Sequence, residues 1–185
     1  MSALRPPEML ETVRLRLRPA AVADAPFVFN GYGSDPDVAR YMMWPRQSRI
    51  EDAVGFLQRC EAVWQAGTSF PWLVERRQDG EPLGMIEMRI DGFKANIGYV
   101  FARSYWGNGY ATEAATALRD WALAQPAIYR FWAYCDTDNA ASARVMEKVG
   151  MKKEGVLRRW VIHPNVSAAP RDALCYAIVK EAGAL

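Results

Sequence analysis

The sequence predicts a single α/β domain with a mixed, mostly antiparallel sheet flanked by helices. Two kinds of segment lead to this prediction. One kind alternates apolar and polar residues with a period of two and is joined by Asp-Gly turns, which is typical of β-hairpins. The other spaces apolar residues three and four positions apart, which is typical of amphipathic helices. The 185 residues, 51% of them hydrophobic and 24% charged, suit one globular domain with its own core.

The first third of the chain predicts a strand followed by helices. Residues 13–17 alternate apolar and polar side chains and predict the first strand. The expected helices are opened by capping residues and cover residues 24–29, a segment that starts at Asp35-Pro36, and a longer segment from the Ser48–Glu51 capping box to Gly67.

The rest of the chain predicts a strand meander and then alternating elements. Three antiparallel strands are expected at residues 69–75, 83–90 and 94–102, joined by turns at Asp79-Gly80 and Asp91-Gly92. The elements expected after them are a helix at 112–124, a strand at 128–135, a helix at 140–149 and strands at 156–162 and 174–180. A long loop, residues 163–171, separates the last two strands.

Composition excludes several classes of protein. Lys and Arg number 23 and Asp and Glu 21, and they are spread along the chain, so a nucleic-acid partner is not expected. No apolar run approaches the roughly 20 residues that span a membrane, and the N-terminus lacks the apolar core of a signal peptide, so we expect a cytoplasmic protein. Three scattered cysteines and one histidine predict buried free thiols and no metal site.

Two glycines, Gly107 and Gly109, lie between a predicted strand and a predicted helix. Glycine permits positive-φ backbone and close approach to a ligand, and amides at a helix N-terminus attract anions. Such glycines also serve as plain turns. A dinucleotide fingerprint would need a third glycine in a parallel βαβ unit, and an NTPase loop would need Gly-Lys-Ser/Thr; neither is present. The amides of residues 107–112 are therefore candidates for holding a diphosphate.

Residues 106–111, WGNGYA, resemble the pyrophosphate loop of the GCN5-related N-acetyltransferase (GNAT) superfamily, Gln/Arg-x-x-Gly-x-Gly/Ala, with Trp106 replacing the Gln or Arg. The run YWGNGYATEA is similar to the branch that contains the ribosomal-protein N-terminal acetyltransferases (RimJ/RimL-like). A second motif, residues 139–151 (NAASARVMEKVGM), resembles the superfamily's Asn-x-x-Ser-x-x-x-x-x-Lys-x-Gly-Phe. The resemblance covers residues 11–182, which leaves residues 1–10 as an N-terminal extension.

The resemblance implies a fold with splayed central strands that form an acetyl-CoA cleft. It also implies direct transfer of an acetyl group from acetyl-coenzyme A to an amine, with an amide near Val100 stabilising the oxyanion. Ser142 is then expected to protonate the departing thiolate, although a first-turn serine can also simply bond the helix backbone. The residues expected to bind the cofactor are Val100, Phe101, Ala102, Trp106, Gly107, Asn108, Gly109, Tyr110, Ala111, Thr112, Asn139 and Ser142.

The general base is less clear from the sequence. Relatives often carry Glu before Ile-Gly-Tyr, where this chain has Asn96, which cannot accept a proton. Glu87 is the nearest acidic candidate, as base and as part of the acceptor site, and the alternative is an ion pair with Arg89. Tyr41 and Trp44 are expected to border the acceptor. His163 could act as a base near neutral pH, but it is expected to serve the loop that it begins.

The function predicted is acetylation of a protein or peptide N-terminal α-amine. An α-amine with a pKa of about 7.7–8.0 is roughly 10–15% neutral at pH 7, whereas a lysine amine is neutral about once in 2,500 molecules, so a weak base suffices for the former. Two alternatives stay open: acetylation of a small-molecule amine, and an acyl-CoA-binding module without turnover. Either a monomer or a homodimer is compatible with the sequence.

Overall fold

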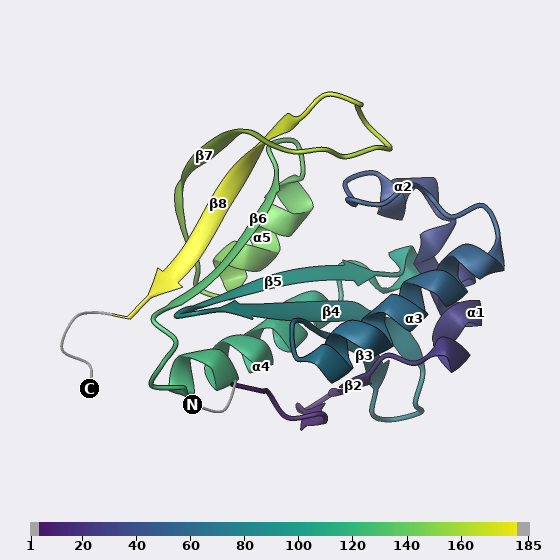
Figure 1. Cartoon of the computed structure of the whole chain (residues 1–185), viewed down its shortest axis with the longest axis horizontal. Helices are drawn as coiled ribbons and strands as arrows, with labels where there is room; N and C mark the ends of the chain where they lie inside the picture. Colours follow the sequence, from purple (N-terminus) through teal and green to yellow (C-terminus); the bar gives the residue numbers. More distant parts are fainter. Residues whose placement is uncertain (1–3, 181–185) are drawn as a thin grey trace.

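Eight strands form one sheet in the computed structural model of the chain, which describes residues 4–180 (Figure 1). All neighbouring strands are antiparallel except β5 and β6, so the predicted mixed sheet is confirmed. The spatial order is β1-β2-β3-β4-β5-β6-β8-β7. The strands are β1 (Leu10–Glu11), β2 (Leu15–Pro19), β3 (Phe70–Arg76), β4 (Pro82–Asp91), β5 (Lys94–Phe101), β6 (Arg130–Asp136), β7 (Lys152–Val161) and β8 (Arg171–Val179).

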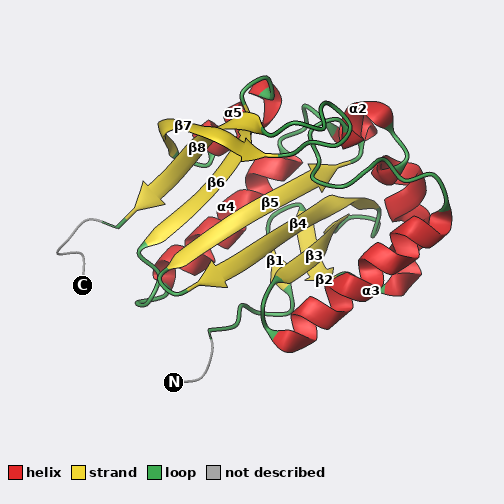
Figure 2. Cartoon of the chain, turned by 45° about the horizontal axis from the view of Figure 1, so that its top comes forward, coloured by secondary structure: helices red, strands yellow, loops and turns green. Residues whose placement is uncertain are grey.

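Helices cover both faces of this sheet (Figure 2). The longer ones are α3 (Ile50–Ala66), α4 (Tyr110–Ala124) and α5 (Ala140–Lys148). The short ones are η1 (Val22–Asp24), α1 (Ala25–Phe27), η2 (Val28–Gly33), α2 (Pro36–Ala39) and η3 (Arg103–Tyr105). One core cluster joins α4 and α5 to the sheet, and a second joins α1 and α3 to the opposite face. The molecule therefore has three layers around two cores.

Apolar spacing explains which face each long helix buries. α3 buries Ala53, Leu57, Cys60 and Trp64, which follow one another at intervals of four, three and four residues. On α4 the buried face is mostly alanine, at positions 114, 115 and 122. Small side chains allow α4 to lie close to the sheet, which brings its N-terminus next to the end of β5.

Three predicted helix starts need correction. The Ser48–Glu51 capping box is wrong: α3 begins at Ile50, and the carboxylate of Asp52 accepts from the backbone amides of Ser48 (2.9 Å) and Arg49 (3.2 Å). The helix predicted at 24–29 is a succession of η1, α1 and η2. α4 begins at Tyr110, two residues before the predicted start at 112, because Gly109 already provides its N-terminal cap. The cap predicted at Asp35 is confirmed.

Several strand boundaries also differ from the prediction, among them those of β2, β7 and β8, the last of which begins at Arg171 rather than 174. The first long strand is shifted to Leu15–Pro19, because Thr12 makes a local turn in which its Oγ1 accepts from the Leu15 amide at 2.9 Å. β7 begins at Lys152 rather than 156, since this edge strand carries exposed polar residues that conceal its periodicity. Residues 181–182 of the predicted domain and residues 1–3 of the predicted extension lie outside the described residues.

The strands β5 and β6 separate after a short stretch of parallel pairing, and Figure 1 shows β6 leaving the direction of β5. Their pairing is confined to residues 94–96 and 130–132. At the end of this paired stretch, the Asn96 side chain donates through Nδ2 to the carbonyl oxygen of Trp132 at 3.2 Å. The expected splay of the central strands is therefore present, and Asn96, which cannot act as a base, anchors the point where it begins.

Candidate active site

A cavity of about 310 Å³ lies where β5 and β6 separate. Its walls come from β4, β5, β6, the start of α5, the helix α3 and the segment between α2 and α3, so residues distant in sequence meet there. The predicted site residues that border it are Tyr41, Trp44, Glu87, Val100, Asn139 and Ser142. Acceptor-side and cofactor-side predictions therefore converge on one cavity.

The glycine loop lies outside this cavity, at the N-terminus of α4. Gly107 and Gly109 have φ values of 80° and 79°, the left-handed backbone for which glycine is suited. A Cβ built on Gly107 would meet no atom within 4 Å. None of the amides of residues 107–112 donates to an acceptor among residues 4–180. Open space and free amides at a helix N-terminus fit a bound diphosphate.

The loop is held in shape by neighbouring side chains. The indole Nε1 of Trp106 donates to the carbonyl oxygen of Phe101 at 2.8 Å, although 49% of this residue is exposed. The Asn108 side chain donates to the carbonyl oxygens of Tyr105 and Trp106, at 3.2 Å each. Trp106 therefore connects the loop to the end of β5. An arginine at this motif position could instead neutralise the charge of a bound diphosphate.

Glu113, in the first turn of α4, ties the loop to the turn before β2. Its carboxylate accepts from Thr12 Oγ1 at 2.5 Å, from the Arg14 amide at 2.9 Å and from Arg14 Nε at 2.6 Å. Arg14 in turn donates through Nη1 to the carbonyl oxygen of Asn108 at 3.1 Å. Burial raises the pKa of Glu113, but the bonds from Thr12 and Arg14 together lower it below its usual value. The ionised carboxylate thus fixes the loop.

Ser142 and Asn139 lie in the first turn of α5, on the cavity wall. The Asn139 Oδ1 accepts from the Ser142 amide at 3.1 Å, which makes Asn139 the N-cap of the helix. The Ser142 Oγ lies 2.7 Å from the Tyr99 hydroxyl oxygen, and the same hydroxyl is 3.1 Å from the Ser142 carbonyl oxygen. Burial raises the pKa of Tyr99, although its bond to Ser142 lowers it somewhat, so the phenol stays protonated. The sequence did not indicate this contact.

Glu87 lies on the cavity wall, on the sheet face opposite Ile86 and Met88, as predicted. Its cross-strand neighbour on β5 is Gly98, and a Cβ on Gly98 would meet nothing within 4 Å. The carboxylate accepts from Ser69 Oγ, from Arg89 Nη2, and from Arg89 Nε at 3.2 Å. The ion pair between Glu87 and Arg89, which the sequence left open as the alternative to a catalytic role, is therefore present. The carboxylate also lies next to the open space at Gly98.

His163 also borders the cavity, whereas the sequence had favoured a role in its loop over a role as base. It is 3% exposed, and neither ring nitrogen has a hydrogen-bond partner among the described residues. The Nε2 atom lies 3.6 Å from Oδ2 of the buried Asp136, at the end of β6. No spacing in the sequence connects these two residues, because they meet only through the sheet.

The cysteines of the described residues are free and buried, as predicted. Cys60 and Cys135 border the cavity. Burial raises the pKa of the Cys60 thiol to about 12 and that of Cys135 to about 11. Both thiols are protonated at neutral pH, so neither is suited to act as a covalent nucleophile.

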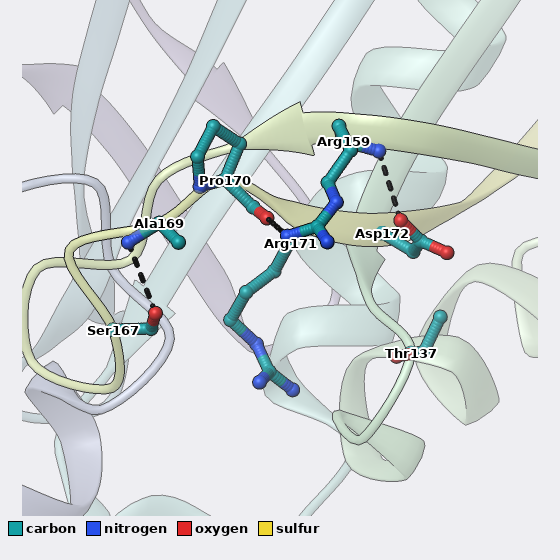
Figure 3. Close-up of a pocket in the computed structure, with 7 residues that line it drawn as sticks. All are labelled: Thr137, Arg159, Ser167, Ala169, Pro170, Arg171 and Asp172. Carbon is teal, nitrogen blue, oxygen red and sulfur yellow. Dashed lines mark hydrogen bonds between the residues drawn. The ribbon is translucent and has the colours of Figure 1, made fainter.

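A second hollow, of about 280 Å³, lies where the β7–β8 loop returns to the sheet (Figure 3). Residues that line this hollow are hydrogen-bonded to one another. The amide of Arg159 donates to Asp172 Oδ1 at 2.8 Å, and the amide of Ala169 donates to Ser167 Oγ at 3.0 Å. Arg171, which borders the hollow, bonds Asp136 and Asp138. The polar groups that border this hollow thus pair with one another and hold the base of the β7–β8 loop.

Residues 4–180 contain no group of three or more His, Cys, Asp and Glu side chains placed to hold a metal ion. Within the same residues, no helix combines the length and the apolar character that crossing a membrane requires.

Comparisons with known proteins agree with this geometry. A family model described as an acetyltransferase (GNAT) domain matches residues 14–152. The uncharacterized N-acetyltransferase YoaA of Bacillus subtilis is 34% identical over 175 residues, which cover 93% of this chain and 97% of YoaA.

Two solved structures share the fold. One is the microcin C7 self-immunity acetyltransferase MccE in complex with acetyl-CoA and AMP, at a TM-score of 0.84 and 23% identity, covering 95% of this chain and 98% of MccE. The other is RimL, a ribosomal L7/L12 α-N-protein acetyltransferase in complex with coenzyme A, at a TM-score of 0.81 and 22% identity, covering 93% of this chain and 98% of RimL.

Proposed function

The chain belongs to the GNAT family and is an acetyl-CoA-dependent N-acetyltransferase, and we propose that its acceptor is the α-amine of a peptide or protein N-terminus. The observation that carries this proposal is the cavity at the β5–β6 splay, where predicted cofactor-side and acceptor-side residues meet. The motif resemblance to ribosomal-protein N-terminal acetyltransferases supports the choice of acceptor. RimL, which shares the fold, is named for the same chemistry.

We assign the cofactor to the glycine loop and the free part of β5. The amides of residues 107–112 would hold the diphosphate, Trp106 and Asn108 would shape the loop, and residues 100–102 of the splayed strand would pair with the pantetheine. Acetyl-CoA supplies a thioester whose carbonyl carbon is attacked by the amine. An amide near Val100 is proposed to stabilise the negative charge that develops on the carbonyl oxygen.

We propose that Ser142 protonates the departing thiolate. Its hydroxyl borders the cavity and is bonded to the protonated Tyr99 phenol, which can replace the proton that Ser142 gives up. Asn139 positions Ser142 by accepting from its amide. The two hydroxyls thus form a short proton path from β5 to the first turn of α5.

The acceptor is proposed to enter along the wall formed by Tyr41, Trp44 and Glu87. The aromatic residues give this wall an apolar surface, and Glu87 adds a carboxylate next to the open space at Gly98. A carboxylate attracts an ammonium group, and the Arg89 guanidinium that pairs with Glu87 offsets part of this attraction. A peptide N-terminus with an apolar first side chain fits this combination.

A small-molecule amine is the second candidate acceptor. The cavity of about 310 Å³ is at the lower end of the size range of small-ligand pockets, which supports a compact acceptor such as an amino acid or a polyamine. The apolar wall and the carboxylate would serve either acceptor.

We also expect a cytoplasmic enzyme, as a monomer or a homodimer. The buried free thiols of the described residues suit a reducing compartment.

The test is an acetyl-CoA assay with matched acceptors. The panel contains short peptides with a free α-amine, the same peptides with that amine blocked, blocked peptides with a lysine, and small amines. Free thiol and product mass are followed. We expect thiol release with free α-amines and none with blocked ones. Product on lysine or on small amines alone would overturn the proposed acceptor, while the absence of product on every amine would contradict catalysis altogether.

A further inference from the structure

His163 is a buried histidine whose two ring nitrogens have no partner among the described residues. It follows β7 and begins the long loop, and it borders the same cavity as Ser142 and Glu87. The Tyr41 ring packs against it edge-on, with ring centroids 6.1 Å apart. Buried polar atoms normally have hydrogen-bond partners, so an unpartnered ring in a cavity wall points to a ligand.

Asp136 is the one carboxylate within reach of this ring among the described residues, at 3.6 Å from Oδ2 to Nε2. It is fully buried and held by Arg171, whose Nη2 donates to Oδ1 at 3.0 Å, and by the amide of Asp138 at 2.9 Å. Burial raises the pKa of Asp136, but Arg171, Asp138 and His163 together lower it, so the carboxylate stays ionised. Its position favours a proton on Nε2 of the imidazole and a free lone pair on Nδ1.

We propose that His163, oriented by Asp136, takes the proton from the ammonium group of the acceptor and so fills the role of base, for which Glu87 was the first candidate from the sequence. The inference rests on the proposed transfer to an amine. The N–H electron pair stays on the acceptor nitrogen when its proton moves to the imidazole, and that pair forms the new bond to the thioester carbon. The attacking nitrogen then gives up its second proton to water, and the carbon–sulfur bond breaks. The thiolate takes a proton from Ser142, which is reprotonated from water through Tyr99, and the imidazolium returns its proton to water.

Glu87 is less suited to this step than His163. Its carboxylate already accepts from Ser69 and Arg89, whereas Nδ1 of the imidazole has no hydrogen-bond partner among the described residues. A base needs an available lone pair aimed at the proton that it removes. Glu87 is then left with the role of attracting the ammonium group by its charge.

Other charged and titratable groups also face the cavity and would affect its pH dependence. They come from every element around it and are Tyr41, Arg59, Cys60, Glu87, Arg89, Tyr99, Tyr134, Cys135 and Asp136, with Arg171 behind Asp136. A rate profile alone therefore does not identify the base, and the test needs a direct signal from His163.

A direct signal from His163 can be measured because it is the single histidine of the sequence. In a tag-free protein labelled with ¹⁵N-histidine, NMR reports the protonation and tautomer of one ring. We expect the neutral ring to carry its proton on Nε2, and we expect its resonances to shift when a peptide acceptor is added to the complex with coenzyme A. A neutral ring protonated on Nδ1, or resonances that do not respond to the acceptor, would overturn the proposal.

Variants provide the kinetic half of the test. We expect His163→Gln to lower kcat at least tenfold, to leave the KM for acetyl-CoA unchanged, and to remove the acid limb of the pH–rate profile. Ser167→Ala, in the same loop, is the matched control and should behave like the wild type. An unchanged kcat and acid limb in His163→Gln would overturn the proposal. If this variant does not fold, the wild-type NMR experiment decides.

Failure of this inference is distinguishable from failure of the proposed function. If the wild type acetylates only small amines, the peptide acceptor is wrong, but the same NMR and kinetic measurements apply to those amines, since their ammonium groups also lose a proton. If the wild type acetylates peptides and His163 fails both measurements, the acceptor assignment stands and the base lies elsewhere.

Discussion

The Tyr99 hydroxyl oxygen lies 2.7 Å from Ser142 Oγ and thereby connects the splayed strand β5 to the first turn of α5. Both residues border the cavity that lies where β5 and β6 separate. Burial keeps the phenol protonated, because it raises the pKa of Tyr99 more than the bond from Ser142 lowers it. The pair can therefore pass a proton to a leaving group without either residue being charged beforehand.

The hydroxyl pair is expected to act as a unit. Ser142→Ala and Tyr99→Phe should each lower kcat by roughly 10–100-fold, and the double variant should be little worse than either single one, because each change interrupts the same path. Thiol release under saturating acetyl-CoA and acceptor measures this. Tyr176→Phe is the control, because it removes a phenol that bonds Glu147 at 3.0 Å outside the cavity. Multiplicative losses in the double variant would contradict a shared path.

Glu87 is expected to affect acceptor binding more than proton transfer. Glu87→Gln removes the charge next to Gly98 but keeps a side chain of the same shape, so the KM for the acceptor should rise about 3–10-fold while the acid limb of the pH–rate profile persists. Steady-state kinetics across pH separate the two effects. If the acid limb disappears in Glu87→Gln and persists in His163→Gln, the base is Glu87.

A substitution in the glycine loop is expected to impair cofactor binding alone. Gly109→Glu places a carboxylate where the diphosphate is proposed to lie, and coenzyme A binding should weaken at least 100-fold by isothermal titration. Gly80→Glu is a matched control, because Gly80 has a φ of 74° and open space around it, but lies in the turn before β4. Both variants should lose similar stability. Equal coenzyme A affinity in the two would remove the loop assignment.

The difference in unfolding free energy between the wild type and a Glu113 variant is expected to depend on pH. Its pKa in the folded protein is lowered, so the contribution of its carboxylate is complete above the unfolded value of about 4.3 and is lost as the pH falls through the lower folded value. Glu113→Gln should therefore cost on the order of 2 kcal/mol at pH 7 and less below pH 4. Urea unfolding at pH 7 and pH 3.5 measures this; a cost that does not depend on pH would show that the charge is unimportant.

The sequence predicted the parts of this protein that depend on local pattern. Period-two alternation located the strands of the meander, and positive-φ glycines marked the loop before α4. The capping box at Ser48 was wrong because two acidic residues, Glu51 and Asp52, offered nearly the same local chemistry, and only packing selects the register of the helix start. Local signals therefore give elements more reliably than their ends.

The contacts that shape the cavity could not be predicted in the same way. Tyr99 meets Ser142 across 43 positions of sequence, and His163 meets Asp136 because β6, β7 and β8 bring their ends together in the sheet. No spacing rule connects such residues in a single sequence. The resemblance to a family indicated Ser142 as a candidate, but its contact with Tyr99, the proposed proton source, became visible only in the fold.

Asn165 joins the β7–β8 loop to the segment that carries Tyr41 and Trp44. Its Nδ2 donates to the carbonyl oxygens of Ala39 (2.7 Å) and Trp44 (2.9 Å), and its Oδ1 accepts from the Arg46 amide at 2.9 Å. Figure 1 shows the loop beside α2, on the open side of the splayed strands. One amide side chain therefore holds the β7–β8 loop to the segment along which the acceptor is proposed to enter.

Removing this side chain is expected to loosen the acceptor site and leave the cofactor loop intact. Asn165→Ala should cost about 1–2 kcal/mol in the free energy of unfolding, raise the KM for the acceptor severalfold, and leave coenzyme A affinity unchanged. Asn165→Asp separates the contribution of the accepted bond from that of the two donated bonds. It keeps the oxygen that accepts from the Arg46 amide and loses both donated bonds. If the donated bonds position Trp44, Asn165→Asp should resemble Asn165→Ala in KM. A wild-type KM in both variants would mean that the loop and the wall bind the acceptor independently.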